Sequence, residues 1–170
     1  MLRRLFVSEQ GAVGVMMLGV FLTMLLVVFM AMGTLAAGVF KNAGQVYGEA
    51  GNALKWAVYA ANFDGVLSGR TSLSAGEVAP YFDYAFQQIT GTTRSGDDFT
   101  GGSLPGPVQL AALNEVPAGT ALPSGTITNQ PGFTVSLTVP VFSGGILGLS
   151  PLTITVTRFA VSQPMPVIQP

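Results

Sequence analysis

One uninterrupted apolar stretch, residues 10–40, constrains this chain more than any other feature of its sequence. The stretch contains no charged side chain, and Leu, Val, Met, Phe, Ala and Gly make up nearly all of it. A helix of about 20 apolar residues spans the hydrocarbon core of a bilayer, so the stretch is long enough to cross it with some tilt. The sequence therefore predicts one transmembrane helix at residues 12–40.

A short basic leader, residues 1–11, precedes this helix, and Arg3 and Arg4 carry its positive charge. Positive charges beside a span favour the cytoplasmic side of the membrane. We therefore expect a single-pass protein of the cytoplasmic (inner) membrane, with its N-terminus in the cytoplasm and its C-terminal head outside it. A cleaved secretory signal, with residues 36–38 as the cleavage site, is the alternative. The apolar core of such a signal has about 7–15 residues, roughly half of what this stretch offers.

Helical periodicity continues past the membrane stretch and predicts a helix extension at residues 41–63. Apolar residues recur there at the spacing of one helix face. They are Ala43, Val46, Tyr47, Ala50, Leu54, Ala57, Val58 and Ala61. Trp56, Tyr59 and Phe63 form a second, aromatic stripe on the opposite side of the helix.

Two interpretations of these two faces stay open. In the first, both faces are buried in one head. In the second, Trp56, Tyr59 and Phe63 anchor the head, and the small residues pack against neighbouring helices. Small residues four apart let two helix backbones approach closely. The candidate helix-packing residues are Gly33, Ala37, Gly44, Gly48, Ala50 and Ala57.

The remaining residues, 64–162, predict a small α+β head. The sequence from Ser74 to Glu77 has the form of a capping box, which begins a helix that Gly91 ends. Strict alternation of apolar and polar residues predicts strands at residues 133–141 and 152–156. A further strand is predicted at residues 108–116. The predicted fold class is α+β. A long transmembrane helix extends outside the membrane and is followed by a head with one short helix and an antiparallel sheet.

The loop between the last two predicted strands is unusually apolar. Its residues Ile146, Leu147 and Leu149 either tuck under the sheet or form an exposed contact for a partner or the membrane surface. The Pro-rich tail, residues 163–170, is predicted to be disordered.

Composition restricts the chemistry that the chain can perform. The sequence contains no Cys and no His, which excludes thiol nucleophiles, Ser-His-Asp triads, zinc sites built on these residues, and disulfides. After residue 62 the acidic residues outnumber the basic ones, so no basic patch for nucleic acid is expected. Asp97 and Asp98 lie in a Gly-rich loop without the spaced ligands of a calcium loop, and calcium stays an alternative there to a solvated loop. We expect no enzyme, no cofactor and no metal site.

The order of these parts resembles the TadE/TadG-type pilin-like proteins of the tight-adherence (Flp) pilus system. The resemblance is carried by the sequence around Gly11-Ala12, by the Ala-rich helix at residues 51–61, and by the closing hairpin. It implies a pilin-like fold, cleavage between Gly11 and Ala12 by a prepilin peptidase, and work as a structural or assembly component of a pilus or a type IV-like secretion system. The implied partners are the lipid bilayer, other pilin-like subunits, assembly proteins and further copies of this chain.

One residue departs from the pattern of type IV pilins. Those proteins usually carry Glu at the fifth residue after the cut, and this sequence has Met16 there. The departure favours a minor, priming or tip subunit over a major pilin. The alternative function is a single-pass, membrane-anchored binding or adhesion module that does not polymerise.

Overall fold

The computed structural model describes residues 9–70, 72–104, 106–142 and 152–162. Ile146, Leu147 and Leu149 of the apolar loop and the Pro-rich tail lie outside the described residues, so the predictions made for them stay predictions. The chain divides into two compact units, Met1–Phe40 and Lys41–Pro170. Helix α2, Glu9–Leu67, is 59 residues long and contributes to both units.

The first unit consists of the apolar part of α2. Every side chain described at residues 13–38 is exposed, and α2 contains the one helix window among the described residues that is long and apolar enough to cross a membrane. The hydroxyls of Thr23 and Thr34 donate to carbonyls of Gly19 and of Met30 and Ala31 in the preceding turn. Polar groups satisfied within their own helix are what a lipid environment requires. The segment is therefore suited to serve as a single membrane anchor.

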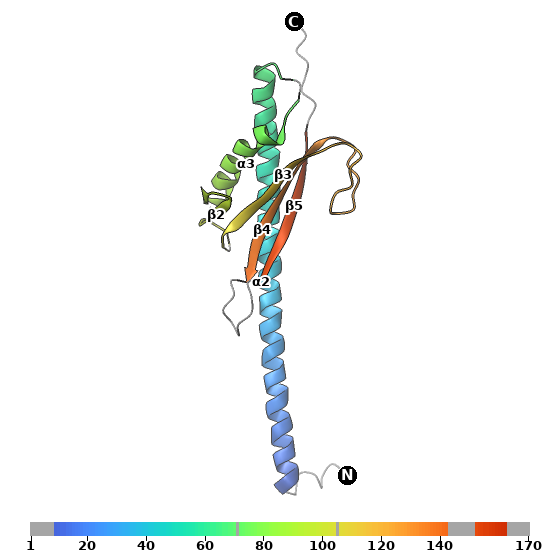
Figure 1. Cartoon of the computed structure of the whole chain (residues 1–170). Helices are drawn as coiled ribbons and strands as arrows, with labels where there is room; N and C mark the ends of the chain where they lie inside the picture. Colours follow the sequence, from blue (N-terminus) through green and yellow to red (C-terminus); the bar gives the residue numbers. More distant parts are fainter. Residues whose placement is uncertain (1–8, 71, 105, 143–151, 163–170) are drawn as a thin grey trace. The chain divides into compact units, whose positions relative to one another are not determined.

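The second unit contains one antiparallel sheet with the strand order β1-β2-β3-β4-β5 (Figure 1). The strands are β1 (Thr93–Ser95), β2 (Asp98–Thr100), β3 (Val108–Val116), β4 (Gly132–Phe142) and β5 (Leu152–Val161). Each strand pairs with the one before it in the sequence, so the sheet is a meander. The α+β class and the three long strands are confirmed, whereas β1 and β2 are additions to the predicted sheet.

The core of the head forms between β4, its neighbouring strands and the last third of α2 (Figure 1). Alternate residues of β4 point inward because successive side chains of a strand face opposite sides of the sheet. The inward residues Phe133, Val135, Leu137 and Val139 are all buried. On α2 the buried residues are Val46, Ala50, Ala53, Leu54, Ala57, Val58 and Ala61.

The small-residue face of α2 thus packs against the head's own sheet. This is the opposite of the interpretation in which the aromatic residues anchor the head and the small residues meet neighbouring helices. Ala50 and Ala57 are fully buried in the core and are not available to neighbouring helices. Trp56, Tyr59 and Phe63 do not anchor the head, because their side chains are 66%, 65% and 62% exposed. The physical reason is size: Ala side chains let the helix approach the sheet closely, and large aromatic rings on that face would hold it away.

Helix α3, Ala75–Thr90, completes the core. Its inward residues Phe82 and Phe86 stack with a centroid distance of 5.5 Å, and Phe86 meets Phe99 of β2 edge to face at 4.8 Å. Each fully buried Phe contributes about 1.5–3 kcal/mol relative to exposure. Gly91 ends the helix at φ 66°, in the left-handed region that glycine adopts without steric cost, as the sequence predicts.

One cation lies on the inward face of the sheet. Arg158 of β5 pairs in register with Val135, so its side chain starts on the core side. Its guanidinium stacks on the ring of Tyr47, 3.9 Å from the centroid, a cation–π contact. A Cβ atom on Gly51 would lie 2.5 Å from Arg158 Nε, so this position of α2 leaves room for the guanidinium because it has no side chain.

The close approach of α2 to the sheet predicts opposite effects for two substitutions on that helix. Ala57→Leu inserts a larger side chain at a fully buried position and is expected to destabilise the head by about 1–3 kcal/mol. Gly48→Ala is the control, because nothing lies within 4 Å of an added Cβ, and it is expected to stabilise by about 0.5–1 kcal/mol. Denaturant unfolding of the full chain in detergent micelles, followed by near-UV circular dichroism, measures both. Equal stability of Ala57→Leu and the parent chain would contradict the packing described.

Candidate interaction surface

The exposed side of α2 in the head carries three aromatic side chains in a row. Trp56, Tyr59 and Phe63 are spaced three and four residues apart, so they lie on one side of the helix. We call them the aromatic ridge. Single exposed apolar residues are ordinary on protein surfaces, but contiguous ones mark interaction sites. Grooves on both flanks extend this apolar surface.

The first groove lies between α2 and α3 and has a volume of about 550 Å³. We call it the α2–α3 groove. No charged residue lines it, and the polar side-chain groups of its lining residues are the Gln88 amide, the Tyr81 and Tyr84 hydroxyls and the Trp56 indole N–H. Its lining residues are Trp56, Ala60, Pro80, Tyr81, Tyr84, Ala85, Gln88 and Ile89.

The second groove lies between α2 and the end of β5, with a volume of about 680 Å³. We call it the α2–β5 groove. Lys55 is its one charged lining residue, and Asn62 and Gln130 add amide groups. Apolar walls come from α2 and from Phe159, Ala160 and Val161 of β5. Trp56 lines both grooves and therefore forms the wall between them.

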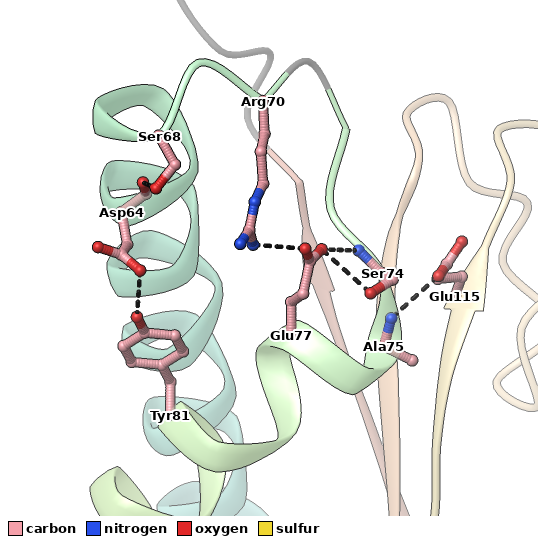
Figure 2. Close-up of polar contacts among 8 residues, drawn as sticks. All are labelled: Asp64, Ser68, Arg70, Ser74, Ala75, Glu77, Tyr81 and Glu115. Atoms are coloured by element: carbon pink, nitrogen blue, oxygen red, sulfur yellow. Dashed lines mark hydrogen bonds and ion pairs between the residues drawn. The ribbon is translucent and has the colours of Figure 1, made fainter.

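Polar contacts at the start of α3 hold the α3 side of the α2–α3 groove in place (Figure 2). Tyr81 lines the groove, and its hydroxyl donates to the Asp64 carboxylate near the end of α2 at 2.9 Å. At the first residue of α3, the backbone N–H of Ala75 donates to the carboxylate of Glu115 in β3 at 2.9 Å. Helix α3 is thus tied at its first turns to both α2 and β3.

Glu77 makes further polar contacts in the first turn of α3. Its carboxylate accepts hydrogen bonds from the backbone N–H of Ser74 at 2.8 Å and from the Ser74 hydroxyl at 3.0 Å, and it pairs with Arg70 (Figure 2). The predicted capping contact from Glu77 back to Ser74 is therefore present. The hydrogen bonds from Ser74, and then the charge of Arg70, lower the pKa of Glu77 below its ordinary value of 4.5. The hydrogen bond to Asp64 raises the pKa of Tyr81.

The other predicted site residues lie apart from this surface. Gly33 and Ala37 are exposed in the first unit, Gly44 and Gly48 are exposed in the second, and Gly11 and Ala12 belong to the first turn of α2. Asp97 lies 3.7 Å from Arg94, which also pairs with Asp83, and Asp98 belongs to β2. Among the described residues, no group of three or more acidic side chains is placed to hold a metal ion.

Sequence reasoning missed the residues that complete the two grooves, namely Tyr84, Gln88, Phe159 and Val161. Tyr84 alone carried a usable signal, because it is a large aromatic residue outside the periodic apolar face of α3 and is 68% exposed. Phe159 and Val161 meet α2 only through the tertiary fold, which no local pattern indicates.

Comparisons with family models, with characterised proteins and with solved structures gave no match to this chain.

The contacts of Glu77 predict how the stability of the head changes in acid. Because the pKa of Glu77 is lowered in the folded state, these contacts stabilise the head above pH 4.5, and the stabilisation is lost as the pH falls through the folded-state pKa. Glu77→Gln should lower the unfolding temperature at neutral pH and flatten its decline in acid. Thermal unfolding of the full chain in micelles between pH 7 and about 3 checks this. Asp97→Asn, at a carboxylate that is 73% exposed, is the control, and an equal change in both variants would refute the assignment.

Proposed function

We propose that this protein is a membrane-anchored, pilin-like structural or assembly subunit of a bacterial tight-adherence or type IV-like pilus or secretion system, of the minor, priming or tip kind. The observation that carries the proposal is the double use of α2. One helix, Glu9–Leu67, supplies the exposed apolar segment and also buries seven side chains in the core of the head. A protein that only needed a tether would not have to build its head on the anchoring helix.

The apolar segment supports assembly because its surface is available. In lipid, helices gain little from the hydrophobic effect against one another, so close packing at small residues favours association. Added Cβ atoms at Gly33, Gly44 and Gly48 would meet nothing within 4 Å, so these glycines are open to a neighbouring helix. With Ala50 and Ala57 buried in the head, the helix-packing set reduces to Gly33, Ala37, Gly44 and Gly48.

The start of the sequence supports the pilin-like part of the proposal. Gly11-Ala12 lies at the beginning of the apolar helix, as does the cleavage site of the TadE/TadG-like proteins that this chain resembles, and the predicted leader contains Arg3 and Arg4. Met16 replaces the Glu with which a repeating pilin meets the N-terminal amine of its neighbour. This replacement favours a subunit used once or a few times over one repeated along a filament.

A second candidate function is a membrane-anchored binding module that acts alone. The exposed ridge and its two apolar grooves favour it, because aromatic side chains beside apolar grooves are common features of binding sites. The two functions differ in whether the apolar helix has a protein partner in the membrane.

Processing is the first test. Mass spectrometry of the protein from cells that contain a prepilin peptidase should find Ala12 as the mature N-terminus. Gly11→Leu should leave the leader in place, whereas Gly14→Leu, a matched change beyond the cut, should be processed. An intact Met1 in the parent chain would remove the processed-pilin version and leave a membrane-resident assembly protein.

Cross-linking in the membrane is the second test and separates the two candidate functions. The natural sequence has no Cys, so single Cys substitutions report only on the chosen positions. Gly33→Cys and Ala37→Cys should form disulfide-linked products with the chain itself or with pilin-like partners under mild oxidation. Leu35→Cys, which faces about the opposite direction on the helix, should cross-link much less. Equally weak products at all three positions would favour the lone binding module.

A further inference from the structure

Strand β5 forms one edge of the sheet. It is ten residues long, contains no Pro, and pairs with β4 alone among the described strands. In the part of the chain that the structure describes, no backbone hydrogen bond reaches its other side, which we call the outer edge. An edge strand presents a row of N–H and C=O groups that a further strand can pair with. The outer edge therefore specifies one kind of occupant, an extended backbone.

The register between β4 and β5 identifies the residues that face the outer edge. The N–H of Ser162 donates to the C=O of Pro131, so these two residues form a hydrogen-bonded pair. Such pairs alternate with non-hydrogen-bonded ones, and the register continues without a shift as far as Thr153 opposite Pro140. The odd-numbered residues from 153 to 161 therefore turn their N–H and C=O groups to the outer edge. Their side chains lie on the face of the sheet away from the core, because the even-numbered Val156 and Ala160 are buried.

The α2–β5 groove reaches this edge. Phe159, Ala160 and Val161 line it in succession. Because successive side chains lie on opposite faces of a strand, a groove that touches all three follows the edge of β5. Its opposite wall on α2 includes Trp56 and Tyr59. A strand added to the outer edge would thus place every second side chain, those on the core side, against two aromatic rings.

The sequence of the tail, residues 163–170, meets both requirements. Its three Pro residues all have even numbers, 164, 166 and 170. In an extended conformation, the N–H groups of the odd-numbered residues all point to one side, where they can pair with β5. The Pro residues, which have no N–H to offer, then fall where none is needed, as in other edge strands. Hydrogen-bonded partners carry their side chains on the same face, so Ile168 and the Pro rings lie on the core side. Pro-rich segments bind aromatic-lined grooves in this way.

The tail is poorly suited to the outer edge of its own β5. Ser162 still pairs with Pro131, so a direct return would need a two-residue turn at Gln163 and Pro164. The turns of two-residue hairpins require positive φ at both residues, or Gly at the first. Pro164 cannot adopt positive φ, and Gln163 is not Gly. A longer turn would use up the Pro positions that fit the groove. A second copy is therefore the suitable acceptor.

We propose that residues 163–170 of one copy add to the outer edge of β5 in a neighbouring copy, as an antiparallel strand whose even-numbered side chains pack against Trp56 and Tyr59. Each copy offers one edge and one tail, so the contact joins copies in pairs or in series. The inference rests on the proposed function only through the membrane anchor, which confines the copies to one bilayer and raises their effective concentration.

Disulfide cross-linking between two differently tagged chains tests the contact, because the natural sequence has no Cys. One full-length chain carries Gln169→Cys, and the other carries Cys in place of Thr153, Thr155 or Thr157. The two chains are mixed, reconstituted in phosphatidylcholine vesicles and mildly oxidised. A mixed dimer should form, with its yield highest at one of the three β5 positions. That yield should exceed the yield with Thr93→Cys, on the opposite edge strand β1, at least about tenfold, since a disulfide needs Cα atoms about 6 Å apart.

Two Pro substitutions in the Gln169→Cys chain test the alternation itself. Val167→Pro removes an N–H that faces β5 and should lower the yield of mixed dimer at least about fivefold. Ile168→Pro is the matched control at the next residue. It removes an N–H on the far side and keeps an apolar side chain toward the groove, so it should change the yield less than about twofold. Equal losses in the two variants would contradict a paired strand.

Three further results would overturn the proposal. The first is a mixed dimer no stronger than with Thr93→Cys. The second is an internal disulfide in a chain that carries both Gln169→Cys and Thr157→Cys, formed in an excess of Cys-free chain, which would assign the tail to its own β5. The third is a Thr157→Cys chain that links to itself more strongly than to the tail, which would assign the outer edge to a second β5.

The outcome is separable from that of the proposed function. The cross-linked chains keep their leader, so failure of cleavage at Gly11 counts against the proposed function alone. A chain that is cleaved at Gly11 but gives no mixed dimer counts against this inference alone.

Discussion

The contact between the small-residue face of α2 and the inner face of the sheet is the interaction on which the rest of the head depends. Ala50, Ala53 and Ala57 are fully buried beside the inward side chains of β4. Because these side chains are small, the helix lies close to the sheet, and the core fills with the larger residues of β4 and α3. The head thereby obtains a core without disulfides, which the absence of Cys demands.

This arrangement also determines what the head shows to its surroundings. A helix that buries its small face must expose the opposite side, and on α2 that side carries Trp56, Tyr59 and Phe63. Helix α3 borders them because the Tyr81 hydroxyl donates to Asp64 of α2 and the backbone N–H of Ala75 donates to Glu115 of β3. The exposed aromatic surface is therefore a geometric consequence of the core.

Local patterns predicted the parts of the fold that depend on local physics. The apolar stretch, the capping contact of Glu77, the glycine end of α3 and the alternating strands all follow from periodicity and turn chemistry. The same patterns could not decide which face of α2 turns inward, since an Ala-rich stripe suits a sheet or a neighbouring helix equally well. The grooves were missed because the residues that line them, such as Trp56 and Phe159, are far apart in the sequence.

Arg158 has a consequence for the alignment of helix and sheet. Apolar faces alone specify position weakly, because Ala and Val side chains pack nearly as well after a shift of one helical turn. The guanidinium of Arg158 fits over Gly51 and against the ring of Tyr47. A helix shifted by one turn in one direction would place Leu54 or Lys55 under this cation in place of Gly51. One arginine and one glycine therefore help to set the register of α2 on the sheet, and among the described residues the buried Nε of Arg158 has no hydrogen-bond partner.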